Sequence, residues 1–220
     1  MKMTMRCSVM FSTALCVFAG CAAKLDGIKG SGNVKTESRV VAGFTSVSLG
    51  GMGKVILRQT GKESLVVSAE DNLLPLLESS IVDHVLKLNM ANNANIHPTK
   101  PIEFIVEVVN LEGLIVSGAG NIEAGDIWGK RLSVSLSGVG NVTVSGTADE
   151  LELKVSGVGG YNGEKFKTRR AVVQSSGVGK AVVNVSEQLD AEVSGVGSVE
   201  YIGSPKVRET VSGVGSVKKR

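Results

Sequence analysis

Residues 132–144 read Leu-Ser-Val-Ser-Leu-Ser-Gly-Val-Gly-Asn-Val-Thr-Val, and this stretch contains the pattern that decides the fold. Leu132, Val134 and Leu136 alternate with serines, which is the period-two signature of a strand with one buried face. Two glycines follow, and glycine readily adopts the backbone angles that a tight corner needs. Val142 and Val144 then belong to a second alternating strand. One such unit therefore predicts two short strands joined by a glycine corner.

The Ser-Gly-x-Gly corner recurs six times. Successive serines are separated by 20, 19, 20, 18 and 18 residues, a period typical of a solenoid with adjustable turns. Counted from each serine, the positions five, three and one before it and two and five after it are apolar in 27 of 30 cases. A degenerate seventh copy covers residues 47–55, with Gly50 in place of the serine. The residues predicted to form the structural turns are Ser117, Gly118, Gly120, Ser137, Gly138, Gly140, Ser156, Gly157, Gly159, Ser176, Gly177, Gly179, Ser194, Gly195, Gly197, Ser212, Gly213 and Gly215.

The composition and the repeat together predict an all-β protein. The chain has 28 Gly, only 4 Pro and 4% aromatic residues, so its core must be built from aliphatic residues that suit strands. Equivalent strands of successive coils can pair in parallel about 4.8 Å apart, which gives a column roughly 25–30 Å tall for six coils. We therefore predict a right-handed parallel β-solenoid with about 18–20 residues per coil. The serines are expected to form a hydroxyl ladder that bonds to adjacent turns, and an antiparallel sandwich is the alternative architecture.

Residues 30–115 are less regular, and we interpret them as diverged N-terminal β coils with insertions. They continue into the regular coils of residues 116–220, so that both parts form one domain. The one segment with a helical pattern is 71–77, where Asp71 or Asn72 is the expected cap and Pro75 lies near the first turn. Strands are expected at 34–41, 54–58, 64–68, 85–90 and 102–109.

The N-terminus has the features of an export signal. A basic start precedes an apolar stretch, residues 9–18, that is short for a membrane-spanning helix. Two small residues come directly before Cys21, an order that resembles the bacterial lipobox, in which cleavage precedes a lipid-bearing cysteine. We predict a lipoprotein signal peptide at 1–20, lipid attachment at Cys21 and a lipidated tether at 21–29. The alternative is an ordinary signal peptide with an incidental cysteine.

Charge and cysteine usage narrow the function further. Because the predicted signal contains Lys2 and Arg6, 22 of the 24 basic residues remain against 21 acidic ones. This balance gives no electrostatic footprint for nucleic acid. With Cys21 acylated, the mature fold has no thiol left for a disulfide. Ala22 follows the cysteine, and by resemblance to the sorting rule of diderm bacteria it favours an anchor in the outer membrane, with the periplasmic or surface face left open.

No motif for enzyme chemistry is complete. The glycine-rich residues 50–54 lack the first glycine of a P-loop, and Val55 stands where a magnesium-binding Ser or Thr is needed. His84 and His97 lie in dissimilar contexts, without the spacing of a metal site. Acidic residues are scattered, unlike the clustered carboxylates of glycoside-cleaving solenoids. We predict no catalytic residue, no metal and no cofactor, and Trp128, between the first two clear coils, is the one candidate for an exposed contact.

The order of motifs resembles a known family. Residues 30–34, 41–44, 50–53 and 68–75, followed by the Ser-Gly-x-Gly coils, are similar to bacterial proteins of the putative auto-transporter adhesin, head GIN domain family. The likeness covers about residues 28–217. It implies a three-sided β-helix on an envelope lipoprotein, without a catalytic motif to transfer. Assembly into a homotrimer is implied by the resemblance alone.

Three hypotheses follow for the function. The first is a non-enzymatic, lipid-anchored cell-envelope protein that presents a β-solenoid surface for binding or adhesion. It would attach to the membrane through Cys21 and to an unknown envelope protein or glycan. The alternatives are a degenerate carbohydrate-active β-helix enzyme and a ligand-free structural spacer. An acidic cluster in a groove would favour the enzyme, whereas a polar face without perturbed carboxylates would favour binding.

Overall fold

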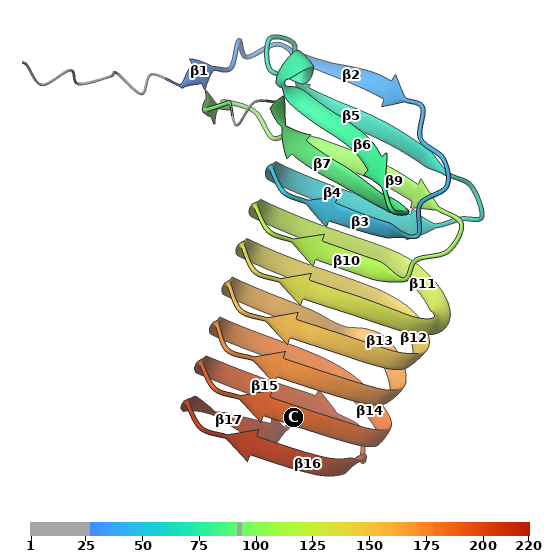
Figure 1. Cartoon of the computed structure of the whole chain (residues 1–220), viewed down its shortest axis with the longest axis vertical. Helices are drawn as coiled ribbons and strands as arrows, with labels where there is room; N and C mark the ends of the chain where they lie inside the picture. The colour runs from blue at the N-terminus through green and yellow to red at the C-terminus, as the bar shows by residue number, and fades with distance from the viewer. Residues whose placement is uncertain (1–26, 92–93) are drawn as a thin grey trace, which may run out of the picture.

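The computed structural model describes residues 27–91 and 94–220 as a column of stacked β coils with a cap at its N-terminal end (Figure 1). The predicted signal peptide, Cys21 and most of the tether lie outside the described residues. The strands of the cap and the column form one continuous sheet, and a separate two-stranded ribbon pairs β1 (Ile28–Lys29) with β8 (Ile96–His97).

The regular part of the column confirms the predicted all-β solenoid. Four long strands, each nearly a whole coil, pair in parallel with the next: β11 (Ala119–Leu136), β12 (Val139–Val155), β13 (Val158–Ser175) and β14 (Val178–Val193). The last coils follow as β15 (Val196–Ile202), β16 (Lys206–Val211) and β17 (Val214–Lys219), again in parallel register.

Each coil has two long sides and one short side. Between β11 and β12, residues 119–124 pair with 139–144, residues 127–129 with 146–148, and residues 131–136 with 150–155. A register shift between Ala124 and Ile127 marks the bend from the first long side to the short one. In Figure 1 the glycine corners stack along one edge of the column and the bends along the other.

The core is a set of residue stacks that run along the column axis. One stack joins Ile122, Val142, Tyr161, Ala181 and Val199, all of them buried. The large ring of Tyr161 lies in register with the small Ala181, so side-chain volume is compensated between neighbouring coils. Aliphatic stacking of this kind is what the period-two pattern of the sequence predicts.

The glycine corner is required by the close approach of successive coils. A Cβ built on Gly140 would overlap the carbonyl oxygen of Gly120, and a Cβ on Gly159 would overlap that of Gly140. Both glycines also have φ near +150°, a conformation that other residues rarely adopt. Beside each corner a backbone ladder continues, for example from the Val158 N–H to the Gly138 carbonyl at 3.0 Å.

One apolar position of the repeat does not point into the core. The valines two residues after each serine are 50–76% exposed and stack in register outside the corner. They follow the tight corner, where the chain reverses before the inward alternation begins again at the fifth position. These residues are Val139, Val158, Val178, Val196 and Val214, with Ala119 at the head of the row.

The N-terminal part stacks on the column and closes its top. On one long side β10 (Gly113–Val116), β3 (Ser46–Leu49) and β7 (Val85–Met90) continue the parallel stack, and β6 (Leu77–Val82) ends it in antiparallel orientation. On the other, β4 (Met52–Gln59) and β9 (Glu103–Val108) are followed by antiparallel β5 (Ser64–Glu70) and β2 (Val34–Arg39).

The helical pattern at 71–77 forms a single 3-10 turn, Leu74–Leu76, with Pro75 near its start. The expected cap is wrong, because the cap residue is Leu73 and no side chain caps the turn. Asp71 and Asn72 instead bond to Ser31: the Ser31 hydroxyl donates to Asp71 and the Ser31 N–H to Asn72. The polar pair therefore fastens the first described segment to the cap.

Candidate functional site

The corner edge carries two parallel rows, one of serines and one of valines. All six predicted serines, from Ser117 to Ser212, are exposed there. Of these six serines, all within the described residues, only Ser137 makes a side-chain hydrogen bond to a neighbouring coil, donating to the Val116 carbonyl at 3.4 Å, so the expected hydroxyl ladder is not formed. The hydroxyls therefore face solvent more than they tie coils together. The edge presents an uncharged surface of hydroxyl and isopropyl groups with the period of the coils.

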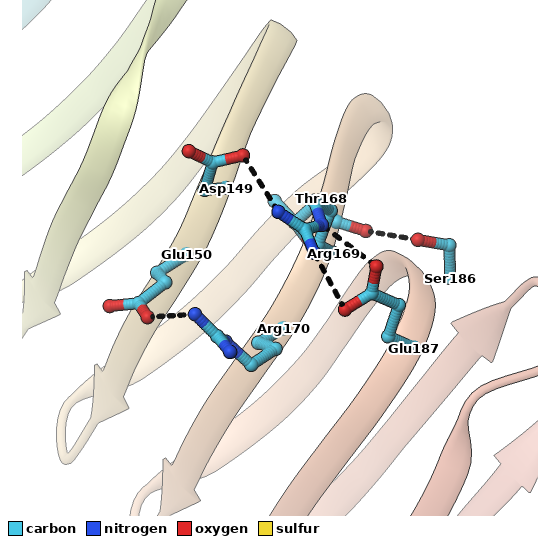
Figure 2. Close-up of polar contacts among 7 residues, drawn as sticks. All are labelled: Asp149, Glu150, Thr168, Arg169, Arg170, Ser186 and Glu187. Carbon is cyan, nitrogen blue, oxygen red and sulfur yellow. Dashed lines mark hydrogen bonds and ion pairs between the residues drawn. The ribbon is translucent and has the colours of Figure 1, made fainter.

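Along the edge where the long sides meet the short side, charged side chains form ion pairs between successive coils. Arg169 lies between the carboxylates of two adjacent coils, with Nε 2.7 Å from Glu187 and Nη1 3.8 Å from Asp149, as Figure 2 shows. Arg170 donates to Glu150 at 2.8 Å beside it. The hydrogen bond and charge of Arg169 lower the pKa of Glu187. All of these side chains are about half exposed, so solvent screens each pair strongly and its contribution to stability is small; the role is structural.

A shallow groove of about 360 Å³ crosses the long side formed by residues 131–136 and their equivalents. Glu150 and Glu152 line it, and Glu152 accepts from Arg131 at 2.6 Å and lies 2.8 Å from Lys154. Hydrogen bonds from Lys154 and then Arg131 lower the pKa of Glu152. A carboxyl held ionised in this way is unsuited to protonate a glycosidic oxygen.

The wider surface shows the same electrostatic trend. Hydrogen bonds from Lys180, opposed by burial, lower the pKa of Glu200 on the opposite long side, and the hydrogen bond from Ser31 lowers that of Asp71 in the cap. Wherever the pKa of a described carboxyl group clearly departs from its ordinary value, it is lowered. This pattern is typical of ion pairing and hydrogen bonding on a stable surface rather than of an acid–base pair.

Trp128 lies at the bend of β11, where the cap meets the first regular coil, and it is 60% exposed. It lines a hollow of about 490 Å³. The hollow's remaining residues offer an amide, a carboxylate, two cations and a glycine: Asn110, Glu112, Lys130, Arg131 and Gly129. Trp128 is thus placed as an exposed aromatic surface with hydrogen-bonding groups beside it.

The two histidines, whose sequence contexts argue against a metal site, lie on different parts of the cap. His84 lies in the cap, where its Nδ1 is 2.9 Å from the Gly43 carbonyl, and His97 belongs to β8. In residues 27–91 and 94–220, no three His, Cys, Asp or Glu side chains are grouped so as to hold a metal ion. Over the same ranges, no helix combines the length and apolar character that crossing a bilayer requires.

A group that sequence reasoning missed is Glu70, which is completely buried at the end of β5. Its carboxylate accepts from the Thr99 hydroxyl and N–H, the Gly32 N–H and the Lys100 N–H, at 2.5–3.3 Å. Burial acts to raise the pKa, but these hydrogen bonds together lower it to about 2. Glu70 thereby joins three segments of the cap, and nothing in its local sequence signals these distant partners.

Solved structures share this architecture. A crystal structure of a putative adhesin from Bacteroides fragilis NCTC 9343 aligns with a TM-score of 0.73 and 27% identity, over 88% of this chain and 100% of that chain. A putative adhesin from Parabacteroides merdae ATCC 43184 gives 0.55 at 18% identity over 89% and 99%. A putative lipid binding protein from Parabacteroides distasonis ATCC 8503 gives 0.52 at 22% identity over 88% and 99%. The last two likenesses concern the fold alone.

The family is identified from the sequence. No curated protein matches the chain. The family described as putative auto-transporter adhesin, head GIN domain, matches residues 43–205, a range that includes β3 to β15. That match spans well over half of the chain and agrees with the resemblance seen in the order of its motifs. The chain belongs to the head GIN domain family of putative auto-transporter adhesins.

Proposed function

We propose that this protein is a non-enzymatic lipoprotein of the cell envelope, which presents the side of its solenoid to a binding partner. Membership of an adhesin-like family supports an adhesion-like role at the envelope or the cell surface. The observation that carries the binding role is the exposed valine row, Val139 to Val214. Contiguous apolar side chains on a surface otherwise rich in ion pairs indicate a contact face.

The architecture suits a display role. Successive coils are joined by backbone ladders along their whole length, so a contact at one coil is held in fixed register with the next. Neighbouring valines repeat about every 4.8 Å. A partner with an extended surface can touch several coils at once, and weak contacts then add through multivalency.

The lipid anchor is proposed from Cys21 and its small preceding residues. Only a short stretch separates Cys21 from Ile28, whose N–H donates to the Asn95 carbonyl at 2.8 Å in the cap. A lipid on Cys21 would therefore hold the cap near the bilayer. We place the anchor in the outer membrane, in accord with Ala22 after the cysteine.

The anchor is tested by metabolic lipid labelling of cells producing the wild-type protein or Cys21→Ala, followed by protease shaving of intact cells. We expect the label to disappear with Cys21→Ala. Digestion of the wild type by external protease would support a surface adhesin. Protection from protease would direct the search to a periplasmic partner, and label retained in Cys21→Ala would refute lipidation at this residue.

The contact face is tested by attachment of producing cells to mucin-coated and cell-coated surfaces. The triple change Val139→Ser, Val158→Ser and Val178→Ser removes apolar area from exposed positions without touching the core. Val172→Ser is the matched control, because Val172 is 45% exposed on a long side away from the row. Attachment should fall for the triple variant alone. Equal attachment by both variants and the wild type would remove the row from the proposal.

The carbohydrate-active enzyme receives no support from the grooves. Three carboxylates line the groove. Glu150 and Glu152 are each paired with a basic side chain, and Asp190 accepts from Gln188 at 2.8 Å and lies 3.5 Å from Arg208. A non-enzymatic role is the one we propose.

A further inference from the structure

Trp128 stands at a position where the fold does not require an aromatic residue. In register with it, the next coils carry Thr147, Lys167 and Asn184. Thr147 and Lys167 are exposed, as is Trp128 itself. The repeats thus provide internal controls, because the same bend is built with small or charged polar residues. An exposed indole at this one coil must be explained by something other than coil geometry.

The backbone beneath the indole is held from inside the protein. The Trp128 N–H donates to the side-chain oxygen of Gln59 at 3.2 Å, and the Gln59 amide donates to the Val109 carbonyl at 3.1 Å. Gln59 is only 6% exposed. Two residues before the tryptophan, Asp126 has φ of 58°, a left-handed conformation within the bend. A buried amide and a fixed bend therefore hold the backbone that carries the ring, which lowers the cost of ordering this segment on binding.

The hollow beside the ring offers both kinds of hydrogen-bonding group. The Asn110 amide donates to Glu112 at 3.0 Å, leaving its own oxygen and the second carboxylate oxygen of Glu112 as acceptors. Arg131 donates to Glu152 at 2.6 Å and has further N–H groups. Gly129 adds no side chain between them. The hollow, at about 490 Å³, lies in the size range of small-ligand sites.

We propose that Trp128 is the stacking platform of a saccharide site, with Asn110, Glu112 and Arg131 contacting the hydroxyl groups of one sugar ring. A pyranose has an apolar C–H face and a rim of hydroxyls that both donate and accept. An exposed aromatic face next to an amide, a carboxylate and a guanidinium matches both parts. An anionic lipid headgroup could pair with Lys130 and Arg131, but it fits less well because the Glu112 carboxylate faces the same hollow. The site deepens the proposed function, on which its biological use rests, by naming a ligand class.

The sequence supplies a direct probe, since Trp128 is the only tryptophan. The full chain carrying Cys21→Ala is titrated with chitotetraose, cellotetraose and tetragalacturonic acid while indole fluorescence is recorded. At least one of them should give a saturable change in emission. No change with any of the three overturns the proposal. A change with vesicles of phosphatidylcholine and phosphatidylglycerol, without one for sugars, overturns it in favour of a membrane contact.

Calorimetry with Trp128→Thr tests the site itself, because threonine is the residue of the next coil. Affinity for the bound sugar should fall at least about tenfold, as expected for a central aromatic anchor. Circular dichroism should show the wild-type fold. Adding Thr147→Trp moves the indole one coil along, away from Asn110 and Glu112, and should not restore binding. Undiminished affinity in Trp128→Thr overturns the proposal, and an intact cell-attachment result beside it leaves the proposed function standing.

Discussion

Replacing Gly159 with alanine should open the stack of coils at the glycine corner. The new Cβ would overlap the Gly140 carbonyl oxygen, far inside the 3.0 Å that real Cβ contacts keep, and would also lie 2.7 Å from the Gly140 carbonyl carbon. These neighbours are backbone atoms, which have no side-chain rotation to relieve the contact. The φ of +147° adds conformational strain. The coils must separate, and the ladder beside the corner is lost with them.

The size of the effect follows from the contacts at the corner. Strain at the positive φ is about 1–3 kcal/mol. Separation weakens the bonds from the Val158 N–H to the Gly138 carbonyl and from the Gly157 N–H to the Leu136 carbonyl, both 3.0 Å, at about 0.5–1.5 kcal/mol each. The free energy of unfolding should therefore fall by about 2–6 kcal/mol. In a domain of this size, that corresponds to a melting temperature lower by roughly 4–24 °C.

The assay is thermal unfolding followed by far-ultraviolet circular dichroism, with Gly125→Ala as the matched control. A Cβ on Gly125 would find its nearest atoms at 3.9 and 4.0 Å, which is ordinary contact. Its melting temperature should stay within about 4 °C of the wild type, since its effect is below about 1 kcal/mol. If Gly159→Ala melts with the control, the close approach of the coils is not what the corner glycines serve.

Three further predictions concern buried and surface groups. The Tyr161 hydroxyl is buried and has no hydrogen-bond partner among residues 27–91 and 94–220, and burial raises its pKa. Tyr161→Phe should therefore raise the melting temperature by about 2–4 °C, and a decrease would reveal a partner. The pKa of Glu70 is lowered to about 2, so its ionised carboxylate stabilises the fold fully above the ordinary pKa of 4.5, and this stabilisation is lost as the pH falls towards 2. The urea midpoint of the wild type should therefore drop between pH 4.5 and 2, and that of Glu70→Gln should drop less. An equal dependence of the two midpoints on pH would contradict the assignment. Arg169→Met should change the melting temperature by less than about 4 °C, since its ion pairs are exposed, and a larger loss would mean that the ties at the bend act cooperatively.

The column could be predicted from the sequence because every coil repeats the same apolar alternation and the same glycine corner. Alternation at Leu132, Val134 and Leu136, restated coil by coil, indicates both the strand and its buried face. The valines after the corner show the limit of this reasoning. Val158 is apolar and periodic like its core neighbours, but the tight corner reverses the chain, and 53% of the residue remains exposed. Apolar periodicity identifies a row without saying on which side of the backbone it lies.

The cap was harder to predict, because its pairing is partly antiparallel and non-local. Strands were expected near β2, β5 and β9, and they are present, but no repeat relates them and their order in the sheet is not encoded by spacing. Glu70 meets Thr99 across almost thirty residues. Trp128 could be identified from the sequence because it is the only tryptophan, but the hollow beside it also needs Asn110, which lies in the loop before β10. Contacts across such separations are visible only once the topology is known.

The glycine-on-glycine corners make the coils interchangeable units. Each corner offers the next one the same backbone surface, so a coil can be duplicated or deleted at the level of the gene without redesigning its neighbours. One unit of 18–20 residues changes the height of the column by about 4.8 Å. The cap stays as it is. With the lipid anchor proposed above, the reach of the column from the membrane would then be a property that evolution, or an engineer, can adjust in even steps.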